Sequence, residues 1–288
     1  MLIPHIRVSS FLCFSCVAAV FFIQPHGNLT KQDPDPQTQE QIQARVALNQ
    51  GLQAFKNGQY EEAIQLFSHA KQLDPNLLNA RLYLAATYRS QYIPGAPSEE
   101  NRQTGEAGIA EFKGVLNLQP ENLSAVDGIG SLLFQMAGQP FDAGKFRESK
   151  TFQQEHIQIK PDDPEPYYWI GVIDWSLAYR ANGELRKGFN ESAGGIKLSN
   201  VEPLPADLRE QYEKGYGSTI EEGIASLKRA IELKPDYEDA MAYLNLLYRL
   251  KADTVASKAE RDELTKMADE LVDTLKEIKQ KRAKRQPQ

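Results

Sequence analysis

Cysteine is nearly absent from the 288-residue sequence. Its two cysteines, Cys13 and Cys16, both lie among the first twenty residues, so we expect neither a disulfide framework nor a cysteine-based zinc site in the rest of the chain. An excess of basic residues is also lacking, because 33 lysines and arginines face 39 acidic residues. This balance argues against a nucleic-acid partner. Only one long apolar run is present, near the N-terminus, which excludes a polytopic membrane protein.

Motifs for catalysis and cofactor binding are missing as well. The chain contains no H-E-x-x-H, no phosphate-binding G-x-x-x-x-G-K-[ST], no dinucleotide-binding G-x-G-x-x-G and no G-x-S-x-G nucleophile elbow. Of four histidines, His5 and His26 lie near the N-terminus, and the other two, His69 and His156, have no metal-ligand spacing. We therefore predict a protein that is not an enzyme and that has no cofactor and no bound metal.

The N-terminus has the pattern of an export signal. Residues 8–23 form a nearly unbroken apolar run after a short, weakly basic stretch, and a polar break follows. This pattern predicts a secretory signal over residues 1–27, cleaved or retained as a membrane anchor. A lipoprotein at Cys16 fits the preceding residues poorly. Residues 28–40 form a proline-containing linker, and we expect a location outside the cytoplasm, periplasmic or extracytoplasmic, with possible membrane attachment.

The body of the chain opens with a repeat pattern. Small, aromatic and proline positions follow one another at fixed spacing, and they are Gly51, Ala63, Phe67, Ala70 and Pro75. Small residues let two antiparallel helices approach closely, and the aromatic ring fills the space beside them. The proline ends the second helix, because it lacks an N–H and clashes with the preceding turn. The pattern resembles the tetratricopeptide repeat, a 34-residue pair of helices.

The second-helix ending recurs three times, at Pro120, Pro161 and Pro235. First-helix patterns follow each of the four prolines, at residues 80–89, 125–136, 166–179 and 240–250. The resemblance therefore implies an all-α fold. We expect a right-handed superhelical solenoid of about four and a half antiparallel helix pairs over residues 41–256.

The spacing between the prolines exceeds 34 residues, which indicates insertions at 91–105, 138–146 and 180–218. The first two are rich in glycine and proline, and we expect loops between helices there. The third has a glycine-rich first half, which indicates a loop, and a short helical pattern over 206–214. Insertions in such arrays often carry specificity, although added loop length is also simply tolerated.

A long helix over 257–284 is predicted to close the chain, with apolar residues on one face. We interpret residues 257–288 as a capping helix with a basic tail, since six basic residues and one acid follow from Lys276 onward. A solvated helix end favoured by the helix dipole explains this tail better than lipid or nucleic-acid binding does.

Two polar residues occupy repeat positions that the family usually fills with apolar side chains. Asp174 falls at position 11, which faces the partner helix, so a buried carboxylate there needs a donor or a shifted pKa. We expect it to pair with an arginine of the 180–218 insertion rather than to act in catalysis. His156 falls at position 27, where alanine is usual, and we expect a packed structural residue.

The resemblance also implies a binding face lined by the first helices. One subset of the family clamps a C-terminal carboxylate with lysine, arginine and asparagine side chains, but only Arg45 and Asn49 fit that pattern here. The face instead offers aromatic residues, which are Phe55, Tyr83, Phe134, Tyr168, Trp169, Trp175 and Tyr243. An exposed aromatic stripe is typical of a binding hot spot. Alternatively, the 180–218 insertion folds back and covers these rings.

We therefore expect a non-enzymatic protein–protein interaction scaffold of the cell envelope, which binds a peptide or protein partner. The alternative is an accessory saccharide-binding or hydrolytic protein, with a site formed by residues 180–218. The sequence leaves the oligomeric state open.

Overall fold

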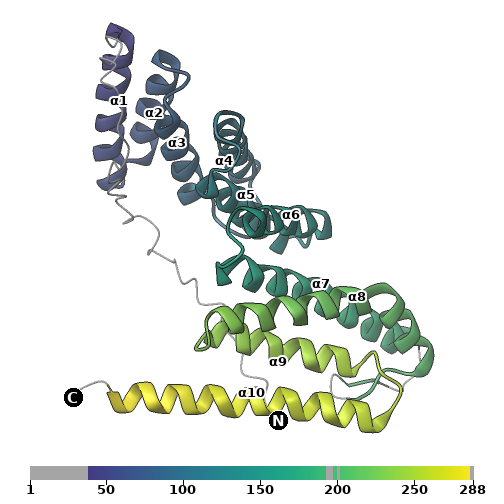
Figure 1. Cartoon of the computed structure of the whole chain (residues 1–288). Helices are drawn as coiled ribbons and strands as arrows, with labels where there is room; N and C mark the ends of the chain where they lie inside the picture. The colour runs from purple at the N-terminus through teal and green to yellow at the C-terminus, as the bar shows by residue number, and fades with distance from the viewer. Residues whose placement is uncertain (1–37, 193–196, 200–201, 286–288) are drawn as a thin grey trace. The chain divides into compact units, whose positions relative to one another are not determined.

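The computed structural model describes residues 38–192, 197–199 and 202–285 (Figure 1). The predicted leader over 1–27 and most of the predicted linker lie outside these residues. From Thr38 onward, the residues that the structure describes belong to one unit and fold into ten helices without a strand. The helices are α1 (Gln39–Lys56), α2 (Tyr60–Leu73), α3 (Leu78–Gln91), α4 (Glu99–Leu118), α5 (Leu123–Gly138), α6 (Ala143–Ile159), α7 (Pro164–Ser192), α8 (Ala206–Leu233), α9 (Glu238–Ala252) and α10 (Lys258–Arg285).

The helices pack as five successive pairs. Each odd-numbered helix packs on the even-numbered helix that follows it, and each pair packs on the next. The first helices of neighbouring pairs also touch, as α3 touches α5 and α7 touches α9. The prediction of an all-helical solenoid of antiparallel pairs is confirmed.

Small residues set the distance between the two helices of a pair. A Cβ atom added to Gly51 of α1 would lie 2.6 Å from the Phe67 ring of α2, and one added to Gly171 of α7 would lie 2.3 Å from Leu227 of α8. Ala63 and Ala70, the other small positions of the first repeat, are fully buried. The close approach that the sequence pattern predicts is therefore present, because no larger side chain fits at these positions.

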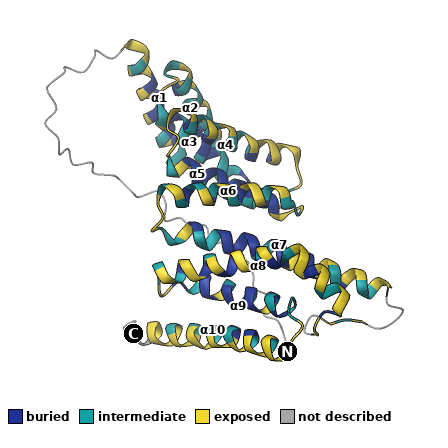
Figure 2. Ribbon diagram, turned by 45° about the vertical axis from the view of Figure 1, so that its right-hand side comes forward, coloured by how far each residue is buried: buried dark blue, intermediate teal, exposed yellow. Residues whose placement is uncertain are grey.

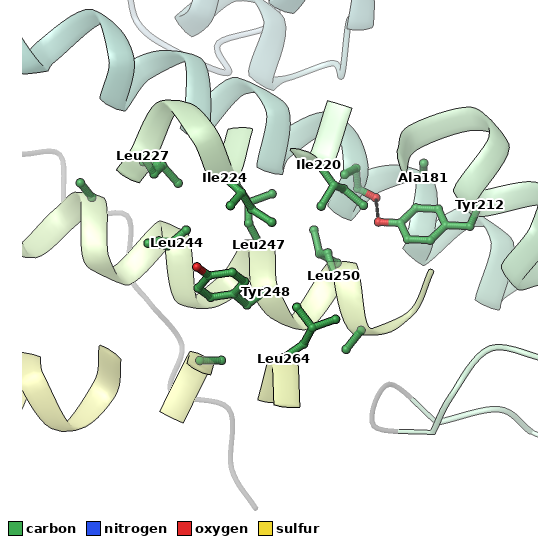
Figure 3. Packing of buried hydrophobic residues seen from close by; sticks show 14 of the residues in the cluster. Ala181, Tyr212, Ile220, Ile224, Leu227, Leu244, Leu247, Tyr248, Leu250 and Leu264 are labelled. Atoms are coloured by element: carbon green, nitrogen blue, oxygen red, sulfur yellow. Dashed lines mark hydrogen bonds between the residues drawn. The ribbon is translucent and has the colours of Figure 1, made fainter. Parts of the chain in front are cut away.

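Apolar residues fill the space between helices along the whole array. Figure 2 shows buried residues where neighbouring helices meet and exposed residues on their outward faces, α10 above all. The largest cluster joins α7, α8, α9 and α10, and Figure 3 shows part of it, including Ile220, Leu227, Leu247 and Leu264. Each pair thus buries its apolar face only against adjacent pairs, as in other repeat arrays.

Each of the two shorter insertions contains a loop between helices, but helix occupies the rest of its length, so the loops are shorter than expected. In 91–105 the loop is limited to residues 92–98, because the Ser98 side chain caps α4 at the backbone N–H of Asn101. Asn101 also fixes the loop, since its side chain accepts from the Ile93 N–H and donates to the Ile93 carbonyl, each at 2.8 Å. In 138–146 the loop is residues 139–142, and the Asp142 side chain caps α6.

The large insertion lengthens both helices of the fourth pair. α7 is 29 residues long and α8 is 28. The glycine-rich first half of the insertion is therefore helical up to Ser192, and the expected loop is absent from residues 180–192. α8 begins at Ala206 as predicted, but continues past the expected end at residue 214. Contacts between the helices outweigh the weak helix propensity of glycine: the buried Tyr212 hydroxyl donates to the Ala178 carbonyl at 3.0 Å.

Arg186 holds the far end of this hairpin. Its buried guanidinium donates to the carbonyls of Ser199 and Glu202, at 2.8 and 2.9 Å, and to the Asp253 carboxylate at 2.8 Å. Asn182 also donates to Asp253 at 3.0 Å. These bonds tie α7 to the segment before α8 and to the residue that follows α9.

The last helix pairs with α9 along its length. α10 spans Lys258–Arg285, so it begins and ends one residue later than the predicted helix over 257–284. Asn245 of α9 donates to the Ala268 carbonyl at 2.7 Å, and Arg282 lies 2.6 Å from Glu238. The predicted capping helix is therefore the second helix of a fifth pair, and it leaves a mostly polar outer face.

Candidate functional site

All seven aromatic candidates lie on the first helices of the pairs. Phe55 is on α1, Tyr83 on α3, Phe134 on α5, Tyr168, Trp169 and Trp175 on α7, and Tyr243 on α9. None is fully buried: Tyr83 is 36% exposed, and the other six are half-buried. The candidates are thus partly accessible, and each ring has one side packed in the array.

Five of these rings are linked to one another across three helices. Trp169 lies 5.1 Å from Phe134 of α5 and 5.2 Å from Tyr168, measured between ring centroids. Tyr168 lies 5.9 Å from Tyr243 of α9, which lies 5.3 Å from Trp175. All four contacts are edge-to-face, a favourable geometry for aromatic pairs. Each ring therefore holds its neighbour in a fixed orientation.

A sixth ring, Tyr179, extends this set and was missed in the sequence. It stacks on Trp175 at 5.0 Å with an interplanar angle of 18° and is 57% exposed. It lies four residues after Trp175 on the same helix face, a spacing that could have found it. We call the linked rings of Phe134, Tyr168, Trp169, Trp175, Tyr179 and Tyr243 the aromatic strip.

The remaining candidates lie outside the strip. Phe55 packs edge-on against Tyr60 at 5.5 Å, and Tyr83 stacks on Phe67 at 5.7 Å, both within the first pairs. Arg45 and Asn49 lie one turn apart on the exposed side of α1. A hollow of about 420 Å³ also lies at α1 and α2, lined mainly by carboxamide side chains. It contains none of the candidates.

The strip lies against the main apolar cluster. Tyr168, Trp175 and Tyr243 pack on the buried residues of α7–α10. Residues 180–192 of the insertion continue α7 beyond Tyr179 along the same helix. This stretch extends the surface that carries the strip.

Two carboxylates flank one end of the strip. Glu165 and Asp239 are exposed in the first turns of α7 and α9. Burial raises the pKa of Tyr168 far above its usual value, and Tyr243, Asp239 and Glu165 raise it further. The Tyr168 hydroxyl therefore stays neutral at all ordinary pH values.

Asp174 has a different partner from the one expected. Its carboxylate is fully buried and lies 2.7 Å from Lys150 of α6, which also lies 2.8 Å from Glu222 of α8. The expected pairing with an arginine of the 180–218 insertion is therefore wrong: Arg180 pairs with Glu184, and Arg186 pairs with Asp253. Burial raises the pKa of Asp174 to about 7; Lys150 opposes the rise, and Glu222 adds to it. Asp174 thus joins three helices at the junction of the third and fourth pairs.

His156 is a packed residue, as expected. It is buried, its Nδ1 lies 2.6 Å from Asp127 of α5, and its Nε2 lies 3.6 Å from Asp163. Burial lowers the pKa of His156, but Asp127 and Asp163 outweigh it and raise the pKa above 6.5. Protonated His156 therefore links α5, α6 and the turn before α7.

Groups of histidine, cysteine or acidic residues that could hold a metal ion are absent from the described part of the chain. Across the same residues, no helix combines the length and apolar character needed to cross a membrane.

Comparisons with known proteins agree with this architecture. Residues 44–77 match the model of the family described as tetratricopeptide repeat. The structure is similar to a crystal structure of MamA protein, with a TM-score of 0.55 and 16% identity, over 85% of this chain and 97% of that one. It is also similar to MamA from residue 41 to its end from Desulfovibrio magneticus RS-1, with a TM-score of 0.52 and 15% identity, over 83% and 96% of the chains. No curated protein matches the chain. At these identities the structural likeness concerns the fold alone.

Proposed function

We propose that this tetratricopeptide-repeat protein is a non-enzymatic scaffold that binds a protein or peptide partner along the aromatic strip. The observation that carries the proposal is the linking of six half-buried or exposed rings on α5, α7 and α9 into one surface. Aromatic residues dominate binding energy at protein interfaces, and contiguous exposed apolar surface marks such sites.

The packing of the strip favours tight binding. Because each ring already contacts its neighbours, little side-chain freedom remains to be lost when a partner binds. Trp175 and Tyr179 form a stacked pair, and Tyr179 is 57% exposed, so this pair offers the most accessible anchor. Binding there requires no rearrangement of the array.

The proposal extends to the compartment. The apolar run over residues 8–23, which lies outside the described residues, supports export and a role in the cell envelope. Without residues 1–27 the chain contains no cysteine, which suits an oxidising compartment. N-terminal sequencing and cell fractionation test this part, and full-length protein found in the cytoplasm would overturn it.

Site-directed photo-crosslinking tests the binding proposal. A photoreactive amino acid replaces Tyr179 in the strip, and a matched variant carries it at Thr151, an exposed position on α6. We expect a discrete crosslinked protein from position 179 and none from position 151. Adding Trp175→Ala to the first variant should abolish the crosslink, since it removes the ring on which residue 179 stacks. Equal crosslinking from both positions would refute the strip as the binding surface.

We do not extend the proposal to a saccharide-binding or hydrolytic site in residues 180–218. The buried polar side chains there, Asn182, Arg186 and Tyr212, are bonded to neighbouring segments of the protein. No observation on that segment favours a substrate.

A further inference from the structure

We infer that the aromatic strip takes a basic segment of its partner, with a lysine or arginine side chain seated between the rings and two flanking carboxylates. This inference rests on the proposed function and specifies the chemistry of the partner.

The carboxylates come from neighbouring helices at the same end of the strip. Glu165 opens α7 and Asp239 opens α9, and these two helices touch. Both act electrostatically on Tyr168 and on Tyr237, whose ring lies 5.1 Å from that of Tyr168. Two negative charges therefore converge on one cluster of rings.

These two carboxylates are not neutralised within the described chain. Glu165 faces the Tyr237 hydroxyl, and neither it nor Asp239 forms an ion pair with a lysine or arginine among the described residues. A neutral hydroxyl leaves the charge of Glu165 intact. A cation from a partner would supply the positively charged group that the described array does not pair with these carboxylates.

The bases around the strip, in contrast, are already engaged. Arg249 of α9 lies 2.6 Å from Asp269. Arg180 lies 2.6 Å from Glu184, and its guanidinium is over the Phe141 ring at 5.4 Å. Lys234 lies over the Tyr237 ring at 4.0 Å, and Arg282 of α10 lies 2.6 Å from Glu238. Among the described residues, none of these bases forms an ion pair with Glu165 or Asp239, so both carboxylates stay available to a partner.

Rings and carboxylates together recognise cations. The faces of tryptophan and tyrosine attract ammonium and guanidinium groups, and a carboxylate accepts their hydrogen bonds. The chain carries 33 basic and 39 acidic residues, so its net negative charge also favours a basic partner. An acidic segment would meet repulsion at the same place.

The two tryptophans of the chain make the test direct. Trp169 and Trp175 are its only tryptophans, and both belong to the strip, so the intrinsic fluorescence of the full chain reports this surface. We would titrate three synthetic peptides of equal length, which share the same leucine and glycine positions and carry arginine, serine or glutamate elsewhere. We expect the arginine peptide to bind at least tenfold more tightly than the glutamate peptide, with an affinity that falls as sodium chloride is added.

Removal of the charges provides the second arm. The double variant Glu165→Gln, Asp239→Asn keeps the size of both side chains and one hydrogen-bond-accepting oxygen on each. It should weaken the arginine peptide about tenfold, at roughly three- to fivefold per exposed carboxylate, and leave the serine peptide unchanged. The matched control, Glu100→Gln with Glu121→Gln, removes two exposed carboxylates away from the strip and should leave both affinities unchanged.

The outcomes distinguish failure of this inference from failure of the proposed function. Equal binding of the three peptides, or tightest binding of the glutamate peptide, overturns the basic preference and leaves the scaffold intact. Failure of every peptide also overturns the preference when the crosslink from position 179 persists. Failure of both the peptides and the crosslink overturns the proposed function as well.

Discussion

Replacing Asp174 with asparagine should change how the stability of the protein depends on pH. The Asp174 carboxyl is 0% exposed, and burial raises its pKa from 3.8 to about 7 although Lys150 lies 2.7 Å away. In the unfolded chain the same carboxyl ionises at its ordinary pKa. Between these two pKa values the folded state holds a proton that the unfolded state has released.

The sign and the size of the effect follow. Because the folded state binds the extra proton, the free energy of unfolding falls as the pH rises from 3.8 to about 7 and then levels off. At 1.36 kcal/mol per pH unit, the loss is about 4 kcal/mol. Asparagine does not ionise and keeps an oxygen that can accept a hydrogen bond from Lys150, so Asp174→Asn should escape this loss.

Urea unfolding followed by tryptophan fluorescence measures the effect, from about pH 4 to about pH 8.5. The quantity to plot is the free energy of unfolding of the variant minus that of the wild type, since titrating groups that do not interact with residue 174 cancel in this difference. We expect it to rise by about 4 kcal/mol across the range. A flat profile for Asp174→Asn would refute the reasoning.

Three further predictions concern packing, a buried ion pair and a histidine. Gly171→Ala would place a methyl group 2.3 Å from a leucine of α8 and should destabilise the protein by about 1–3 kcal/mol in urea unfolding. In contrast, the methyl group of Gly183→Ala would meet nothing within 4 Å, and this substitution should stabilise its helix by about 0.5–1 kcal/mol. Arg186→Met should cost about 3–5 kcal/mol, because it leaves the Asp253 carboxylate without its charged partner and two carbonyls without their donor, and amide exchange at Ser199 and Glu202 should accelerate. Titration by NMR should give His156 a pKa above 6.5, and Asp127→Asn should lower this pKa. The stability that the His156–Asp127 pair contributes is complete below pH 6.5 and is lost as the pH rises through the pKa of His156 in the folded protein.

The sequence was informative where one residue decides local geometry. Proline marked the helix ends, and Gly51 opposite Phe67 marked the close approach of two helices. It was misleading over 180–218, where glycines suggested a loop. There the deciding contacts join distant residues, as when Tyr212 bonds to Ala178 and Arg186 bonds to Asp253, and a local pattern does not contain them.

The candidate site, too, could be predicted from the sequence only in part. Repeat positions identified aromatic residues on the first helices, because the register of a helix follows from the repeat. They did not identify which rings meet: Trp169 contacts Phe134, whereas Tyr83 stacks on Phe67, outside the strip. Tyr179 was missed because it lies past the repeat positions that line the face. The partner of Asp174 was missed because Lys150 lies on another pair.

Polar contacts hold together the helices that carry the strip. Asp174 joins α7 to α6, His156 joins α6 to α5, and Arg186 joins α7 to the residue after α9. Apolar burial is non-directional and permits small slides between helices, whereas a buried hydrogen bond tolerates little displacement. These bonds therefore fix the spacing of α5, α7 and α9, on which the ring contacts of the strip depend. Loss of the Arg186 contacts should thus disturb the tryptophan fluorescence of the folded protein, whereas Asp174→Asn, which retains an acceptor for Lys150, should not.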